Sequence, residues 1–130
     1  MSVAAHIVVT AAVIKRDGRY LVTRRIKGQH LAGMWEFPGG KREPGETLEA
    51  SLIREIQEEL GADAVVREVL LTARHDYDTR SVELHFFACD LTSEPQPRLG
   101  QEIRWVTPAE LATLEFPPAD AELIELLKQG

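Results

Sequence analysis

The sequence predicts an α+β fold, a mixed α/β/α sandwich in which helices cover both faces of a β-sheet. Two apolar, strand-like segments open the chain and are separated by a turn signal. One amphipathic helical segment follows, then further strand-like segments, and the chain ends in short helical segments. With 130 residues and no long linker, the whole chain 1–130 is expected to form a single domain.

The first two strands should form a hairpin. Residues 6–15 are rich in Val, Ile and Ala, which suits a buried strand, and residues 20–23 resume the same character. Asp17-Gly18 between them is a strong turn signal. The polar stretch 24–34 is interpreted as a loop, and a short apolar strand segment, 35–37, follows it.

A helix of about 13 residues is expected in the middle of the chain, with Thr47 as its N-cap and Gly61 as the residue that ends it. Four apolar residues recur every fourth position and form one stripe: Leu48, Leu52, Ile56 and Leu60. Such a stripe is typical of a helix that packs on a sheet.

The second half of the chain repeats the pattern of strands followed by helices. Residues 65–73, 82–91 and 103–106 have strand character. Pro108 begins a short helix at a favoured first position, and residues 121–128 form the last helix. Three leucines of that helix are expected to face inward: Leu123, Leu126 and Leu127.

The overall charge narrows the choice of partner. A net charge of −6 disfavours a nucleic-acid polymer, whereas a small anion remains possible if bound cations invert the local field. No apolar run reaches the roughly 18 residues that a membrane helix needs, and no secretory leader is evident, so we expect a cytoplasmic protein. The single cysteine, Cys89, excludes a disulfide within the chain.

Three glutamates gather on one side of the expected central helix. Glu55, Glu58 and Glu59 fall within about 100° of helical arc. Like charges at this spacing destabilise a helix, and the last turns of a helix favour cations over anions. A hard divalent cation such as Mg²⁺ would relieve both effects, and no His or Cys at matching spacing suggests zinc. The competing interpretation is an acidic face exposed to water.

Residues 40–62 read GKREPGETLEASLIREIQEELGA, which resembles the Nudix box in residue type and spacing. The eight matching positions are Gly40, Glu46, Arg54, Glu55, Ile56, Glu58, Glu59 and Gly61. Ala62 departs from the pattern because it is smaller than the usual aliphatic residue. The resemblance implies the Nudix fold, with a loop–helix–loop carrying Mg²⁺, or Mn²⁺ in its place, packed on a mixed sheet beside a C-terminal helix.

The resemblance also assigns roles within the box. Glu55, Glu58 and Glu59 would bind the metal together with the carbonyl of Gly40. Arg54 would hold Glu55 in place.

The catalytic candidates are Glu55, Arg54 and Glu102, and a fourth residue, Glu46, is expected to have a structural role. Glu46 would support the turn before the helix through hydrogen bonds. Glu55 is the first candidate for the group that activates water, and Glu102, outside the box, is the second. Glu102 is equally well explained as an ordinary surface residue.

Similarity beyond the box points to the MutT-like branch, whose members convert a nucleoside triphosphate to a monophosphate and pyrophosphate. The segments concerned are 24–25, 35–41 and 116–120. In that branch the residue after Phe-Pro-Pro-Ala reads the base and is often Asn, whereas here it is Asp120. An ionised Asp only accepts hydrogen bonds, and a protonated one can also donate. We therefore expect 8-oxo-dGTP, with a role in DNA repair, and keep CTP or 5-methyl-dCTP as the alternative.

Five residues are candidates for binding the nucleotide: Arg25, His30, Phe37, Arg80 and Asp120. The arginines are equally well explained as surface residues, His30 as a loop residue and Phe37 as part of the core. The partner is expected to be a small nucleotide, and the protein a monomer or homodimer. Other hydrolase branches that act on ADP-ribose or dinucleotides carry extra motifs that this chain lacks. A non-catalytic base-binding Nudix module is the alternative from another class, although such modules generally lose the box glutamates.

Overall fold

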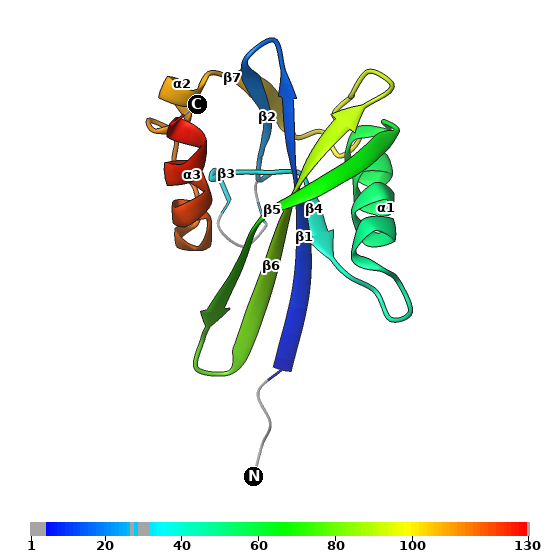
Figure 1. Cartoon of the computed structure of the whole chain (residues 1–130), viewed down its shortest axis with the longest axis vertical. Helices are drawn as coiled ribbons and strands as arrows, with labels where there is room; N and C mark the ends of the chain where they lie inside the picture. Colours follow the sequence, from blue (N-terminus) through cyan, green and yellow to red (C-terminus); the bar gives the residue numbers. More distant parts are fainter. Residues whose placement is uncertain (1–4, 27, 29–31, 130) are drawn as a thin grey trace.

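The computed structural model describes residues 5–26, 28 and 32–129, and it confirms the mixed α/β/α sandwich. Figure 1 shows the strands in the middle, helix α1 on one side and helices α2 and α3 on the other. The elements in chain order are β1 (Ala5–Arg16), β2 (Arg19–Arg24), β3 (Trp35–Glu36), β4 (Gly39–Lys41), α1 (Leu48–Leu60), β5 (Ala64–Asp76), β6 (Arg80–Leu91), β7 (Glu102–Val106), α2 (Pro108–Leu111), the 3₁₀ helix η1 (Pro118–Asp120) and α3 (Ala121–Lys128).

Strand β1 is the centre of the sheet. It pairs in parallel with β6 along its length, and antiparallel with β4 and then β2 on its other edge. Strand β5 pairs with β6, while β3 and β7 both pair with β2. The predicted hairpin is present, with Asp17 and Gly18 both at positive φ, 52° and 76°. Two such residues match the twist of the strands that they join.

The sheet is buried on both faces, which explains why β1 is apolar almost throughout. One face packs against α1 through a cluster that includes Ala12, Ile14, Leu21, Leu52, Ile56, Leu60, Phe87 and Cys89. The other face packs against α2 and α3 through a cluster that includes Val13, Val22, Phe37, Phe86, Leu111, Leu123 and Leu127. The cavities described below lie at the margins of these two clusters.

Two local expectations need correction. Leu126 is 48 % exposed, because Leu123 and Leu127 define the buried side of α3 and Ile124, rather than Leu126, completes it. Strand β4 was not anticipated, since two glycines have low strand propensity and the strand forms only by pairing with β1. No helix in the described part of the chain is long and apolar enough to cross a membrane.

Candidate active site

Helix α1 begins and ends where the sequence predicts. The Oγ1 of Thr47 accepts a hydrogen bond from the backbone N–H of Ala50 at 3.1 Å, and Gly61 ends the helix in the left-handed conformation, with φ of 59°. The apolar stripe packs on the sheet, so the acidic side is left beside the glycines of β4.

Arg54 connects the start of this helix to its acidic side. Its guanidinium binds Glu46 through two hydrogen bonds, from Nε at 2.7 Å and from Nη2 at 2.9 Å. Its Nη1 donates to Glu55 at 2.9 Å and to Glu58 at 3.2 Å. These contacts raise the pKa of Arg54, and the bonds from Arg54 lower the pKa of Glu46 to about 2. Arg54 therefore stays charged and fixes the two carboxylates that follow it.

Glu46 also closes the turn that precedes α1. Its Oε1 accepts a hydrogen bond from the backbone N–H of Glu43 at 2.8 Å, as well as from Arg54. Arg54 donates a further bond to the carbonyl of Lys41 at 3.1 Å. The turn, β4 and α1 are thus tied together through one guanidinium group.

The surroundings of Glu59 disfavour the charged form of its carboxyl group. Burial raises its pKa to about 9, and a hydrogen bond with Glu55 and repulsion from Glu55 and Glu36 act in the same direction. A hydrogen bond from the backbone of Gly39 opposes this rise. A carboxyl group in these surroundings is neutral near pH 7 unless a cation compensates its charge.

The backbone of β4 comes close to the same carboxylates. A Cβ atom at Gly40 would lie 2.6 Å from the carboxyl carbon of Glu55, so only glycine leaves room for that side chain. As they stand, with Arg54 on Glu55 and Glu58, no three acidic, His or Cys side chains among residues 5–26, 28 and 32–129 are placed to hold a metal ion. The donor set still fits a hard cation, since it is all oxygen and includes the Glu59 carboxyl, whose pKa is raised by burial and by neighbouring carboxylates.

The C-terminal end of α1 is closed by the segment between β6 and β7. The backbone N–H groups of Gln96 and Arg98 donate to the carbonyls of Leu60 and Glu59 at 2.7 and 3.1 Å. The buried side chain of Gln101 donates to the carbonyl of Glu59 at 2.9 Å. The last turn of the helix, which carries Glu59, is therefore held from outside the helix.

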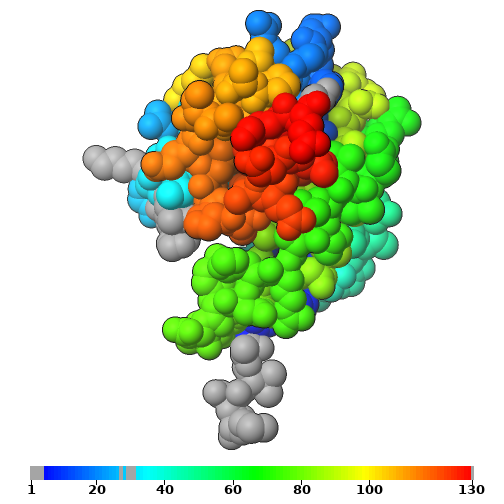
Figure 2. All heavy atoms as spheres, turned by 60° about the vertical axis from the view of Figure 1, so that its left-hand side comes forward, coloured from blue at the N-terminus to red at the C-terminus, as the bar shows by residue number. Residues whose placement is uncertain are grey.

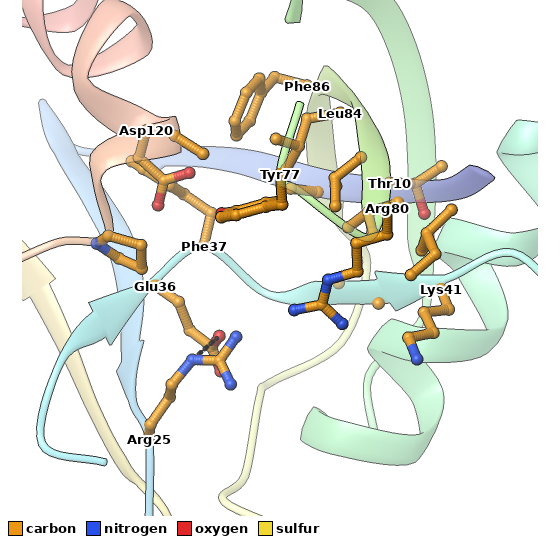
Figure 3. A pocket seen from close by; sticks show the side chains of 18 residues that line it. Thr10, Arg25, Glu36, Phe37, Lys41, Tyr77, Arg80, Leu84, Phe86 and Asp120 are labelled. Carbon is orange, nitrogen blue, oxygen red and sulfur yellow. Dashed lines mark ion pairs between the residues drawn. The ribbon is translucent and has the colours of Figure 1, made fainter. Parts of the chain in front are cut away.

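Two cavities meet at this place. The acidic one has a volume of about 310 Å³ and is lined by Thr23, Arg24, Arg25, Ile26, Glu36, Gly39, Glu55, Glu58, Glu59, Leu99 and Gln101. The second, of about 270 Å³, lies on the opposite face of the sheet and is mainly apolar (Figure 3). It is lined chiefly by Val9, Phe37, Val82, Leu84, Phe86, Ala119 and Asp120, with Tyr77 and Arg80 from the β5–β6 turn.

Arg25, Glu36 and Gly39 line both cavities. The Nε of Arg25 lies 3.0 Å from the Oε2 of Glu36, and Figure 3 shows this pair below the apolar cavity. Burial raises the pKa of Glu36, and the charge of Arg25 opposes the rise. One elongated ligand could therefore reach from the apolar cavity to the acidic one across this ion pair.

Asp120 is a buried residue that lines the apolar cavity. It is 7 % exposed, and no hydrogen bond from the described residues reaches its carboxyl oxygens. Burial raises its pKa to about 7, and Glu36 adds to the rise while Arg25 opposes it. A carboxyl of this kind can accept or donate near neutral pH, which suits the recognition of a polar ring edge.

The other predicted nucleotide-binding residues have different environments. Arg80 lines the mouth of the apolar cavity, and its guanidinium points into the same open region as that of Arg25 (Figure 3). Phe37 lines the cavity but is only 5 % exposed. Its ring stacks on Phe116 at 5.4 Å between centroids and meets Phe86 edge-on at 6.3 Å. Phe37 is thus both a core residue and a cavity wall.

One predicted site residue is not brought to the cavities, and another lies outside the described residues. Glu102 is about half exposed, lies 3.6 Å from Arg24 and lines neither cavity. Its neighbour Ile103 packs in the cluster beneath α1, so Glu102 faces the other side of β7. His30 lies outside the described residues.

Three residues at the site escaped the sequence analysis: Glu36, Tyr77 and Gln101. A charged residue between Trp35 and Phe37 was an available signal for Glu36, since apolar neighbours on both sides indicate a buried strand. Nothing local distinguishes Tyr77 or Gln101, because each lines its cavity together with residues that are distant in the chain.

Comparisons with known proteins agree with this geometry. A family model described as the NUDIX domain matches residues 9–126. The CTP pyrophosphohydrolase of Escherichia coli K12 is 38 % identical over 118 residues, which cover 90 % of this chain and 87 % of that protein. The 8-oxo-dGTP diphosphatase of Haemophilus influenzae is 39 % identical over 121 residues, covering 92 % and 89 %. The solution structure of the E. coli ORF135 protein has a TM-score of 0.84, with 36 % identity, and the match covers 94 % of this chain and 88 % of that one.

The sandwich and the acidic helix beside it are those of a phosphoanhydride hydrolase of Nudix type. The chain belongs to the Nudix hydrolase family, in its MutT-like branch, and the sequence-based assignment is confirmed.

Proposed function

We propose that the protein is a Mg²⁺-dependent pyrophosphohydrolase that converts a nucleoside triphosphate and water to a nucleoside monophosphate and pyrophosphate. The observation that carries the proposal is the junction of the two cavities at Arg25, Glu36 and Gly39. A base in the apolar cavity and phosphates beside the box glutamates would place the sugar at this junction.

The box residues fit the binding of a divalent cation, on which this family typically depends. Glu55, Glu58 and Glu59 would hold it, with the carbonyl of Gly40 as a further ligand. A bound Mg²⁺ neutralises phosphate charge and orients water for attack on phosphorus. Arg54 keeps Glu55 and Glu58 in one arrangement, which limits the reorganisation that binding requires.

Glu55 is the better candidate for orienting or deprotonating the attacking water. It lines the acidic cavity and is positioned both by Arg54 and by the glycine backbone. Glu102 is the less favoured candidate, because its side chain pairs with Arg24 outside that cavity.

Asp120 is proposed to read the base. An ionised carboxylate accepts from the two donors on the Watson–Crick edge of 8-oxoguanine. A protonated carboxyl donates to N3 of cytosine and accepts from its amino group. Both states are accessible with a pKa of about 7.

We propose 8-oxo-dGTP as the first substrate to test. The names of relatives at 38–39 % identity, an 8-oxo-dGTP diphosphatase and a CTP pyrophosphohydrolase, support these two candidates equally. CTP and 5-methyl-dCTP remain candidates because residue 120 is an Asp, which has a carboxyl group, and not an Asn, which has an amide.

The test is a panel of canonical and oxidised triphosphates, scored for kcat/KM and for Mg²⁺-dependent release of pyrophosphate. Glu58→Gln should lower turnover by orders of magnitude while leaving the melting temperature nearly unchanged, because Glu58 is exposed. Glu49→Gln, an exposed change in the first turn of α1, is the matched control. Release of no pyrophosphate by the native protein would instead indicate a base-binding module without catalysis.

A further inference from the structure

The turn between β5 and β6 contains an aromatic residue with no role in the site as described so far. Tyr77 lines the apolar cavity and is 47 % exposed. Figure 3 shows Tyr77 near Asp120 and Phe37, around the opening of this cavity. In Figure 2 the green hairpin that carries it lies directly below the orange segment that includes residues 116–120.

Phe37 is poorly suited to stacking on a ligand. One face of its ring is covered by Phe116, with 23° between the ring planes, and Phe86 contacts it at an interplanar angle of 81°. Exposing more of Phe37 to a base would disrupt these core contacts, which stabilise the fold. Phe37 can supply a wall for the ligand, but it is only 5 % exposed and presents little ring surface for stacking.

Tyr77, in contrast to Phe37, is partly exposed. Its ring is supported by His75, with centroids 4.6 Å apart, and by the guanidinium of Arg80, 5.5 Å from the ring centroid. The backbone N–H of Tyr77 donates to the carbonyl of Arg80 at 2.7 Å, which fixes the turn. The ring is therefore oriented by its neighbours and still retains exposed surface beside the cavity.

We infer that Tyr77 is a substrate-binding residue that stacks on the base of the bound nucleotide. A base whose edge reaches Asp120 lies in a cavity whose mouth is bordered by Tyr77. Aromatic stacking on a base tolerates different bases, because each base has a π-face. Tyr77 thus contributes affinity for a nucleobase as a class, while Asp120 selects among bases. The inference rests on the proposed function.

The experiment measures dissociation constants by NMR titration for guanosine, cytidine and 8-oxodeoxyguanosine monophosphates, with ribose 5-phosphate as the ligand that lacks a base. Tyr77→Ala should weaken binding of the monophosphates on the order of tenfold, the size expected for one base stack. It should leave ribose 5-phosphate within twofold of the native value. Tyr77→Phe keeps the ring and should match the native protein for every ligand.

Leu126→Ala is the control, since Leu126 is equally exposed and lies on α3 away from both cavities. Monophosphate binding by Tyr77→Ala within twofold of native, an equal loss for ribose 5-phosphate, or no binding of any monophosphate by the native protein would overturn the inference. These results are separate from turnover. A native protein that binds monophosphates through Tyr77 but hydrolyses no triphosphate would overturn only the proposed function.

Discussion

Gly40 and the carboxyl group of Glu55 are packed so closely that a Cβ atom on Gly40 would lie 2.6 Å from that group. The backbone of Gly40 is in an ordinary conformation, with no positive φ, so the constraint comes from space and not from torsion. The pair shows that the glycine at the start of the Nudix box leaves room for the side chain of Glu55.

We predict that Gly40→Ala displaces Glu55 and lowers kcat about 10- to 100-fold, the range seen when the groups that position metal ligands are perturbed. The melting temperature should change little, because the added methyl group meets the far end of a side chain. Steady-state kinetics and Mn²⁺ binding by electron paramagnetic resonance provide the measurements. The loss of kcat caused by Gly40→Ala is also measured in the Glu55→Gln background. A loss of the same size in that background would contradict the steric explanation.

We predict that Gln101→Ala destabilises the protein and weakens metal binding together. The change removes one of two hydrogen bonds that the carbonyl of Glu59 accepts, because the backbone N–H of Arg98 still supplies the other, and this loss costs about 0.5–1.5 kcal/mol. This corresponds to a fall of roughly 2–5 °C in melting temperature for a chain of this size. Gln57→Ala, at an exposed position of α1, is the control for loss of a glutamine side chain. Normal Mn²⁺ affinity in Gln101→Ala would argue against a positioning role.

Metal binding should release a proton in mildly alkaline solution. Glu59 has a pKa of about 9 in the metal-free protein, so it is about 90 % protonated at pH 8. A bound cation requires the carboxylate form. Titration with Mg²⁺ in a weak buffer should release close to one proton for each ion bound, and Glu59→Gln should abolish the release. Proton release that persists in Glu59→Gln would assign it to another group.

The stability of the protein should depend on Asp120 between about pH 4 and pH 7. Burial raises its pKa from 3.8 to about 7, so in this range the native state binds more protons than the unfolded state. The free energy of unfolding therefore falls by up to roughly 4 kcal/mol as the pH rises through this window. Above the window, Asp120 adds no further pH dependence.

Asp120→Asn resembles the protonated form, so it should match the native protein near pH 4 and exceed it in unfolding free energy at pH 8. Glu59, whose pKa is also raised, is not among the groups that shift the pKa of Asp120, so its contribution cancels in the difference. Glu36 repels Asp120, so its contribution cancels only in part. Denaturant unfolding at a series of pH values is the measurement. A constant difference at every pH would show that Asp120 does not titrate in this window.

Base preference should also follow the ionisation of Asp120. The protonated form suits cytosine and the ionised form suits the Watson–Crick edge of 8-oxoguanine. The ratio of kcat/KM for CTP to that for 8-oxo-dGTP should therefore fall several-fold as pH rises through about 7. Asp120→Asn, which keeps donors and an acceptor at all pH values, should show a nearly constant ratio. The same pH profile in both proteins would remove Asp120 from base selection.

Sequence reasoning succeeded where the signal was local. Thr47 and Gly61 delimit α1 because capping depends on a few adjacent residues, and the resemblance placed Arg54 on Glu55 correctly. It failed where the determinant was distant in the chain. Strand β4 exists through its pairing with β1, and Leu126 is exposed because α3 packs through Leu123, Ile124 and Leu127.

The residues of the candidate site also differ in whether nearby or distant parts of the sequence position them. The box glutamates are close in sequence and could be grouped from spacing alone. Glu36 and Tyr77 line the apolar cavity from β3 and from the β5–β6 turn, about 40 residues apart, so no periodicity links them. A sequence can identify side chains on one helix face, whereas the residues of a cavity wall emerge only after the sheet is assembled.

The segment between β6 and β7 is a surface connection, and such connections usually tolerate changes of length. Here its amide groups at Gln96 and Arg98 terminate α1. Adding or removing a single residue there would shift those donors by more than the reach of a hydrogen bond. The length of this connection should therefore vary little among proteins that share the chemistry, while the β1–β2 turn, remote from both cavities, should be free to lengthen.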